Sequence, residues 1–366
     1  MLADRVRRID ASGIRKVFDL AATMKDPINL SIGQPDFDVP EPVKEAGIAA
    51  IRAGFNRYTV TQGIPELHDR IRRMLREEKQ FEPEATLITS GTSGGLLLAF
   101  LATVNPGDEV IIPDPYFVMY KHLVTLCDGK PVFLDTYPDF RLRREALEPL
   151  ITPRTKMLLI NSPCNPTGTV YSADELRMVA DLVGERDILV ISDEIYESFV
   201  YADGYTSLAS LYPRALLLGG FSKTYGMTGW RLGYAAGPRE VIGQMTKLQQ
   251  YTFVCAPSFA QKAGLAALDL KTADYLADYR RKRDLIYNGL IDAGYEVEKP
   301  EGAFYIFPKV PWGTDMEFAE TAIRNNLLLI PGSVFSERNT HVRIAYPAPD
   351  ETIERGLEVL RRLAKR

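Results

Sequence analysis

Short apolar runs alternate with longer segments of helical periodicity between about residues 85 and 240. This alternation predicts a mostly parallel sheet whose strands are joined by crossover helices, an α/β fold. Most of the runs are apolar on both faces, as strands are when helices cover both sides of a sheet. The predicted strands are residues 87–89, 109–112, 157–160, 188–191, 215–218 and 232–235.

The pattern changes after about residue 272, where helical segments surround short strands. The expected helices are residues 273–293, 315–325 and 351–364, and the expected strands are residues 303–306 and 341–344. This order predicts a smaller α+β domain. The turn at Pro27 and the segment 33–36 suggest that the N-terminal arm joins it. We therefore divide the chain into an arm with part of the small domain (1–33), a large domain (34–272) and a C-terminal small domain (273–366).

Polar side chains follow five of the predicted strands. They lie in segments 90–93, 113–116, 161–165, 192–193 and 222–223. Because open α/β sheets bind ligands outside the carboxyl ends of their strands, we expect these five ends to share one site.

Lys223 follows the apolar run 215–218 and has small residues around it. A partly desolvated lysine, or one beside a cation such as Arg231, has a lowered pKa and can attack a carbonyl as the neutral amine. The alternative is an ordinary turn lysine, because Lys is mostly exposed. The other strand ends favour the reactive lysine.

The segment 90–95, Ser-Gly-Thr-Ser-Gly-Gly, precedes the apolar run 96–104. Free amides at a helix N-terminus form an anion site, although a capped helix start would have a similar sequence. With Ser222, Lys223 and Arg231 converging on it, phosphate is the favoured ligand. The spacing matches neither a Walker loop nor a dinucleotide-binding turn.

Asp193 ends the run 188–191, and a buried carboxylate requires a partner. One interpretation is a helix N-cap. The other is an ion pair with a pyridinium nitrogen, which stays protonated and makes the ring an electron sink. Asn165 and Tyr196 could then hydrogen-bond an oxygen on that ring.

Composition excludes several classes of protein. The 366 residues are 46% hydrophobic and 25% charged, as in ordinary soluble proteins, and the net charge is −4 with scattered Lys and Arg. These values argue against a nucleic-acid groove. The first ten residues are too charged for a signal peptide, and the longest mainly apolar stretch, 96–104, is too short for a membrane span.

Cysteine and histidine spacing gives two further expectations. Three cysteines at unrelated spacings, Cys127, Cys164 and Cys255, make a disulfide framework improbable, so we expect a reduced, cytoplasmic protein. The histidines, His68, His122 and His341, match no metal-ligand spacing, so no metal is predicted.

These motifs together resemble the class I aminotransferases of the aspartate aminotransferase superfamily, over essentially the whole chain and in order. The resemblance rests on segments 161–168, 192–196, 222–223 and 229–231, with further matches at 33–36, Tyr58, 62–63, 302–305 and 342–346. It implies fold type I of the pyridoxal-phosphate-dependent transferases and pyridoxal 5′-phosphate as cofactor.

The resemblance also implies roles for single residues. Lys223 would bind the cofactor covalently, Asp193 would pair with its ring nitrogen, and Tyr196 and Asn165 would contact its 3-oxygen. Phe117 takes the place of the stacking aromatic, although spacing alone does not decide between it and Tyr116. The phosphate would be held by Gly91, Thr92, Ser93, Ser222, Arg231 and, from a neighbouring subunit, Tyr58. Arg343 would clamp the substrate α-carboxylate, and Asn165 and Gly33 would lie beside the substrate.

The implied reaction is a ping-pong transfer of an amino group from an L-amino acid to 2-oxoglutarate, in a homodimer. A C–S β-lyase on the same scaffold is one alternative, and a non-catalytic ligand sensor is a remote one. One branch of the family has a lysine where this chain has Ser93, which argues against strict aspartate specificity. The stretch 11–18 and the segment 161–165 resemble the branch of aromatic and broad-range enzymes. We therefore expect an aromatic amino acid or aspartate as donor.

Overall fold

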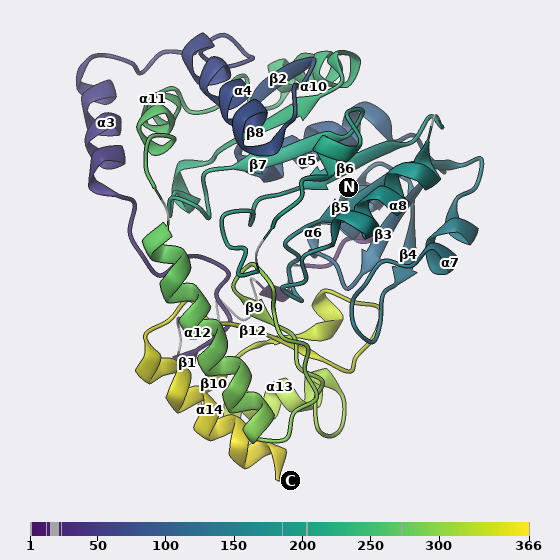
Figure 1. Ribbon diagram of the computed structural model, residues 1–366, viewed down its shortest axis with the longest axis vertical. Helices are drawn as coiled ribbons and strands as arrows, with labels where there is room; N and C mark the ends of the chain where they lie inside the picture. Colours follow the sequence, from purple (N-terminus) through teal and green to yellow (C-terminus); the bar gives the residue numbers. More distant parts are fainter. Residues whose placement is uncertain are drawn as a thin grey trace.

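The computed structural model of the chain describes residues 2–11, 13–14, 22, 24–184, 186–202, 204–271 and 273–365. Ser12 and residues 15–18 of the N-terminal stretch 11–18 lie outside this set. Figure 1 shows a central sheet with helices on both sides and, below it, a smaller group of helices and short strands.

The central sheet has seven strands in the order β2-β8-β7-β6-β5-β3-β4. Only β8 runs antiparallel, to its two neighbours β2 and β7, so the predicted mostly parallel sheet is confirmed. All six predicted strands are present. The bounds are β2 Ala85–Ser90, β3 Glu109–Asp114, β4 Lys130–Asp135, β5 Thr155–Asn161, β6 Leu189–Asp193, β7 Leu216–Gly220 and β8 Leu232–Gly237.

The strand β4 is absent from the sequence prediction, and its position at the edge of the sheet explains why. It begins with the exposed Lys130, continues with Pro131, and has Leu134 as its one buried residue. Proline and charge are typical of edge strands, which have one side without a hydrogen-bonded neighbour. The apolar run that marks a central strand is therefore missing.

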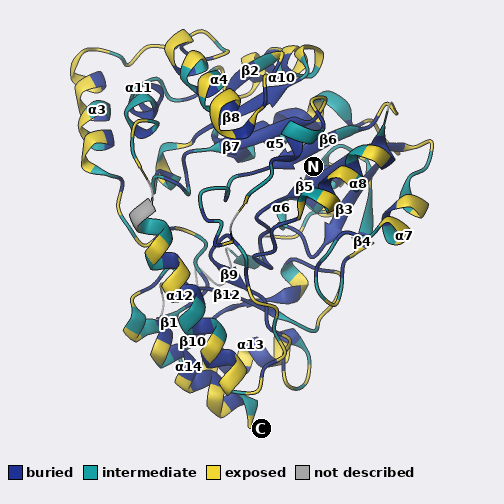
Figure 2. Ribbon diagram, viewed as in Figure 1, coloured by how far each residue is buried: buried dark blue, intermediate teal, exposed yellow. Residues whose placement is uncertain are grey.

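Alternate residues of each strand pack on opposite faces of the sheet. In β5, Leu158 and Ile160 pack with α4, α8 and α11, whereas Met157 and Leu159 pack with α5, α6 and α10. Figure 2 shows the sheet buried between these two helical layers. Their bounds are α3 Glu41–Arg52, α4 Pro65–Lys79, α5 Gly91–Thr103, α6 Met119–Leu126, α8 Ala173–Val183, α10 Arg239–Tyr251 and α11 Ser258–Ala267.

The part of the molecule around the central sheet also contains several short helical turns, and one of its helices has a clear N-terminal cap. The N-cap of α8 is a capping box in which Ser172 and Glu175 each accept a hydrogen bond from the other's backbone amide. The remaining helical turns are α1 Asp4–Arg7, α7 Arg144–Leu147, η1 Glu148–Leu150, α9 Leu208–Leu211 and η2 Thr228–Trp230. Within the described ranges, no helix is long and apolar enough to cross a membrane.

The C-terminal part has its own core, in which Phe304, Ile306, Phe318 and Ile344 are fully buried. All the segments expected after residue 272 are present, as helices α12 Ala273–Asp292, α13 Asp315–Arg324 and α14 Asp350–Ala364 and strands β9 Tyr305–Ile306 and β12 Val342–Ala345. The structure adds two short strands and a turn that were not expected, β10 Leu327–Leu328, β11 Ile330–Pro331 and η3 Gly332–Val334.

The N-terminal arm packs with this C-terminal part. Strand β1, Ile28–Asn29, pairs in parallel with β10, and the amide of Ala345 donates to the carbonyl of Leu30 at 2.8 Å. The arm therefore brings the following residues, including Gly33, to the junction between the two parts.

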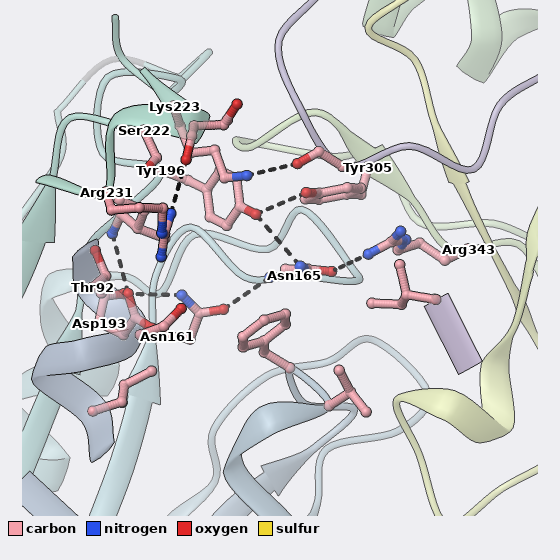
Figure 3. Close-up of a pocket in the computed structure, with 18 residues that line it drawn as sticks. Thr92, Asn161, Asn165, Asp193, Tyr196, Ser222, Lys223, Arg231, Tyr305 and Arg343 are labelled. Carbon is pink, nitrogen blue, oxygen red and sulfur yellow. Dashed lines mark hydrogen bonds between the residues drawn. The ribbon is translucent and has the colours of Figure 1, made fainter. Parts of the chain in front are cut away.

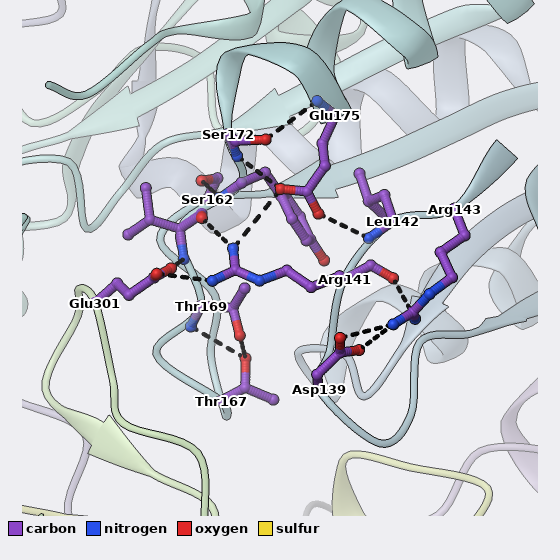
Figure 4. A network of polar contacts seen from close by, with 12 residues as sticks. Asp139, Arg141, Leu142, Arg143, Ser162, Thr167, Thr169, Ser172, Glu175 and Glu301 are labelled. Atoms are coloured by element: carbon purple, nitrogen blue, oxygen red, sulfur yellow. Dashed lines mark hydrogen bonds and ion pairs between the residues drawn. The ribbon is translucent and has the colours of Figure 1, made fainter.

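A polar network on one side of the molecule also joins the two parts (Figure 4). Arg141 donates to Glu301 at 2.7 Å and to the carbonyl of Val170 at 2.8 Å. Glu301 in turn accepts from the amide of Val170 at 3.2 Å. Glu301 lies just before β9, so this network fixes the start of that strand against the central sheet.

Candidate active site

The carboxyl ends of four central strands, β2, β5, β6 and β7, open into one cavity of about 400 Å³. Figure 3 shows side chains from both parts of the molecule pointing into it. The polar lining consists of Thr92, Ser93, Asn161, Asn165, Asp193, Tyr196, Ser222, Lys223, Thr228, Arg231, Tyr305 and Arg343. The remaining lining residues are Ile14, Gly33, Leu96, Phe117, Val118 and Ile195.

Lys223 follows β7 and points into this cavity. Its Nζ donates a hydrogen bond to the carbonyl of Gly33 at 2.6 Å. Burial, with the positive charges of Arg343 and Arg231, lowers the pKa of Lys223 to about 8. A much larger share of the amine is therefore neutral near pH 7 than for an exposed lysine, whose pKa is about 10.4.

The helix α5 presents its N-terminus to the cavity beside a guanidinium. Gly91 has φ +68, where a side chain would be strained, and a Cβ there would lie 2.6 Å from Nη2 of Arg231, so glycine is favoured at this position. Arg231 itself has φ +53, a conformation that costs energy for a non-glycine residue and is common at functional sites. The backbone amides of α5, the hydroxyls of Thr92 and Ser93, and Arg231 form a site for a phosphate dianion.

Asp193 is buried at the end of β6. The hydroxyl of Tyr120 donates to its Oδ2 at 2.7 Å, and the amide of Ile195 donates to its Oδ1 at 3.3 Å. Burial raises the pKa of Asp193 to about 6, although the hydrogen bond from Tyr120 opposes the shift. A carboxylate in this state would be stabilised by a cation placed in the cavity.

Asn165 connects the two sides of the cavity. Its Oδ1 accepts from Arg343 at 3.0 Å, and its Nδ2 donates to the hydroxyl of Tyr196 at 3.5 Å. Tyr196 is also paired with the hydroxyl of Tyr305 at 2.8 Å, and Asn161 holds the backbone of Asn165 through an amide contact at 3.0 Å. The positions of these polar groups are therefore mutually fixed.

Arg343 lies in β12 and is only 1% exposed. Its guanidinium is stacked between the rings of Tyr305 and Phe335, at 4.6 and 4.5 Å from the two centroids. Besides its bond to Asn165, it donates to the carbonyl of Ser31 at 2.8 Å, while its Nε has no partner among the described residues. A buried N–H without a hydrogen-bond partner is costly, and a guanidinium binds carboxylates well. This group could therefore bind a carboxylate ligand.

The structure brings most of the predicted site residues to this cavity. Gly91 lies beside the lining rather than in it, and Tyr58 is 82% exposed and lies outside it. Phe117 lines the cavity, whereas its neighbour Tyr116 does not.

One sequence expectation is wrong in part. The segment 113–116 does not point into the shared site, because Asp114 and Tyr116 instead contact residues 335–337 of the C-terminal part. Sequence reasoning could not foresee this contact, because the two segments are more than 200 positions apart.

Several lining or supporting residues, among them Asn161, Tyr305 and Tyr120, were not assigned a role from sequence. Asn161 and Tyr305 lie inside quoted motifs, so their motif positions were the available signal. Tyr120 lies three positions after Phe117, a helical spacing that puts both side chains on one face. Its contact with Asp193 depends on the pairing of distant strands and gives no sequence signal.

Comparison with known proteins identifies the family. The profile of the class I and II aminotransferases matches residues 25–360. The chain belongs to this family. It is 38% identical, over 99% of its length and 100% of the relative, to a probable aspartate aminotransferase of Methanocaldococcus jannaschii. It is 37% identical to aromatic-amino-acid aminotransferase 2 of Thermococcus litoralis, over 100% of this chain and 98% of the relative.

The aminotransferase is also similar to solved structures. The structure of an aspartate aminotransferase from Thermus thermophilus with maleate matches it with a TM-score of 0.96 and 35% identity over 99% of each chain. The predicted fold class, enzyme class and cofactor are thereby confirmed: the chain is a pyridoxal-phosphate-dependent amino-acid aminotransferase.

The side chains present fit pyridoxal 5′-phosphate. The cavity contains an anion site at α5, an amine of lowered pKa, and a buried carboxylate without a cation. These three features match the phosphate, the aldehyde and the ring nitrogen of the cofactor. The volume lies within the usual range for small-molecule pockets, about 300–1,000 Å³.

The lowered pKa of Lys223 gives a first prediction. The rate at which the apo aminotransferase binds pyridoxal phosphate covalently should rise with pH and level off above about pH 8, because only the neutral amine reacts. Stopped-flow absorbance across pH 6 to 10 measures it, with R343Q as a comparison. Removing that cation should move the inflection to higher pH, and a rise that continues through pH 10 in the unaltered protein would refute the prediction.

Proposed function

We propose that this aminotransferase transfers the amino group of an aromatic amino acid or aspartate to 2-oxoglutarate, in two half-reactions at the one cavity. The observation that carries the proposal is the presence, in that cavity, of an amine of lowered pKa and a buried guanidinium whose Nε has no partner among the described residues. Arg343 would hold the α-carboxylate while Lys223 acts at the α-carbon.

Each residue of the site then has a proposed task. Lys223 would hold the cofactor covalently, and its amine, when free, would take up the proton that leaves the substrate α-carbon. Asp193 pairs with the ring nitrogen, and Phe117 stacks on the ring. Tyr196 and Asn165 hydrogen-bond the 3-oxygen. The bound cofactor supplies an electron sink for the charge that forms at the α-carbon.

The phosphate would be held by residues from two strand ends and by the start of α5. They are Gly91, Thr92, Ser93, Ser222 and Arg231. The left-handed backbone of Arg231 supports this assignment, because a backbone in a costly conformation is retained where its side chain has a task.

Substrate orientation would come from Arg343, Asn165 and Gly33. Asn165 contacts both Arg343 and Tyr196, so it links the carboxylate clamp to the proposed position of the ring. Gly33 lies against Tyr305, where a Cβ would be 2.6 Å from the tyrosine hydroxyl. The carbonyl of Gly33 accepts a hydrogen bond from Nζ of Lys223, so the substrate would lie on the side of the lysine that faces Gly33.

The wall of the cavity supports an aromatic donor. Among the described lining residues, the cations are Lys223, Arg231 and Arg343, and each has a proposed task. The neighbouring wall contains Ile14, Val118 and Ile195, which suit an uncharged side chain. Relatives named as aspartate and as aromatic-amino-acid aminotransferases support keeping both donors in the proposal.

We further propose a homodimer in the cytoplasm, with the large domain formed by residues 34–272 and the small domain by 1–33 and 273–366. Exposed apolar side chains near the phosphate site support the dimer: Tyr58, Val60 and Tyr251 are 82, 62 and 85% exposed. Gln249, which lies in α10 together with Tyr251, connects this helix to the segment of Tyr58 and Val60 by donating to the carbonyl of Thr61 at 2.7 Å. Tyr58 would then reach the phosphate of the neighbouring subunit.

A panel of amino donors tests the proposed function. The holoenzyme is mixed with one amino acid at a time, and loss of the bound cofactor's absorbance measures the first half-reaction. Phenylalanine, tyrosine and glutamate should react, and 2-oxoglutarate should reverse the change. Aspartate turnover above that of phenylalanine and tyrosine by orders of magnitude would contradict the aromatic preference, and no reaction with any donor would contradict the function.

A further inference from the structure

The end of β3 differs from the four strand ends that line the cavity. Its residues Asp114 and Tyr116 are 5 and 3% exposed, yet neither lines the cavity. Both contact the segment 335–337, which lies between η3 and β12. The polar groups of Asp114 and Tyr116 therefore serve a contact with the C-terminal part and not the cofactor site.

Four hydrogen bonds hold the segment 335–337 against the end of β3 and the start of α6. The amide of Tyr116 donates to the carbonyl of Phe335 at 2.7 Å, and the amide of Glu337 donates to Oδ2 of Asp114 at 3.0 Å. The hydroxyl of Tyr116 and Nζ of Lys121 both donate to Oε1 of Glu337, each at 2.7 Å. Three of the four involve Tyr116 or Asp114, which are buried, so they are screened less than a surface ion pair.

Both ends of this junction lie next to residues with a proposed task. On one side, Tyr116 directly precedes Phe117, the proposed stacking ring. On the other, the ring of Phe335 lies against the guanidinium of Arg343 at 4.5 Å. The junction thus connects the carboxylate clamp of one domain to the ring site of the other.

We propose that Tyr116 and Glu337 are positioning residues, which fix Arg343 relative to Phe117 and thereby set the affinity for the substrate α-carboxylate. The inference rests on the proposed role of Arg343. Neither residue touches the substrate or the cofactor. Their effect passes through the segment 335–337: the hydroxyl of Tyr116 holds the carboxylate of Glu337, the amide of Tyr116 holds the carbonyl of Phe335, and the ring of Phe335 covers the guanidinium.

The chain offers a control for the loss of a charged contact elsewhere. Lys156 pairs with Asp187 at 2.6 Å on the surface, with side chains that are 30 and 95% exposed. This pair contacts neither Phe335 nor Arg343. If the loss of any ion pair weakens carboxylate binding, K156A should weaken it as well; if Arg343 is positioned, only changes at the Tyr116–Glu337 junction should do so.

The test measures the Kd of 3-phenylpropionate, a carboxylate without an amino group, from the absorbance change of the bound cofactor. Y116F and E337A should each raise this Kd by roughly tenfold, a typical size for coupling between sites. They should raise KM for phenylalanine similarly while kcat changes less than about twofold. E337Q keeps an oxygen that can accept from Tyr116 and should stay near the unaltered protein.

Three further measurements make the outcome decisive. Equal cofactor content per chain shows that Y116F, which loses one hydroxyl, is folded. K156A should leave the Kd unchanged, and an equal rise there would overturn the proposal. R343Q must weaken binding, since an unchanged Kd would refute the role of Arg343 and this inference together. If R343Q weakens binding but Y116F and E337A do not, the positioning role alone is wrong.

Discussion

Replacing Lys223 by alanine is expected to abolish turnover, with a loss of at least about 10³-fold in kcat. The side chain is the one lysine amine among the described lining residues, and its pKa of about 8 makes it both a nucleophile and a base near neutral pH. The variant should still bind pyridoxal phosphate through the anion site at α5, but without the absorbance of the covalently bound cofactor. Absorbance spectra and steady-state rates measure both effects.

Two comparison variants separate chemistry from charge. K223R keeps a positive charge but cannot supply a neutral amine, because arginine is not deprotonated in proteins, so it should be as inactive as K223A. K156A removes a lysine that pairs with Asp187 at the surface and should be fully active. Substantial activity in K223A would contradict the role assigned to Lys223.

Replacing Asp193 by asparagine is expected to lower kcat by about 10²- to 10³-fold, the usual effect of removing one preorganised electrostatic group. The amide fills the same space and can still accept from Tyr120, but it has no charge with which to keep the ring nitrogen protonated. The cofactor should remain bound to Lys223, because its phosphate and aldehyde contacts are unchanged. Single-turnover rates of the first half-reaction measure this step directly.

The pKa of Asp193 gives the sign of a related effect. Burial raises it to about 6 in the absence of a cation, and a positively charged ring nitrogen would lower it again. D193E keeps the carboxylate and should recover part of the lost rate. D187N, a carboxylate-to-amide change at the surface, should have no effect. A rate in D193N equal to that of the unaltered protein would contradict the proposed ion pair.

Much of the fold follows from the sequence because the strands β5, β6 and β7 are buried on both faces and form continuous apolar runs. The carboxyl ends of such strands meet at one edge of the sheet, which is why Asp193 and Lys223 could be assigned to one site. The strand β4 was not predicted, because an edge position tolerates Lys130 and Pro131 and so lacks a continuous apolar run.

Contacts between segments that are far apart in the chain could not be predicted from sequence patterns. Arg343 alternates with apolar neighbours and, without the family resemblance, is indistinguishable from an exposed strand residue. Its bond to Asn165 spans 178 positions, and the bond between Lys223 and Gly33 spans 190. Tyr116 and Phe117 are adjacent aromatics, and only the three-dimensional arrangement shows that one lines the cavity and the other holds Glu337.

The most direct test of the central claim follows the amino group itself. The holoenzyme is incubated with ¹⁵N-labelled phenylalanine and unlabelled 2-oxoglutarate, and the nitrogen-containing products are identified by mass spectrometry. The account predicts ¹⁵N-glutamate and phenylpyruvate in equal amounts, with no labelled ammonia. Label that remains in phenylalanine after prolonged incubation, or that is released as ammonia without glutamate formation, would contradict it.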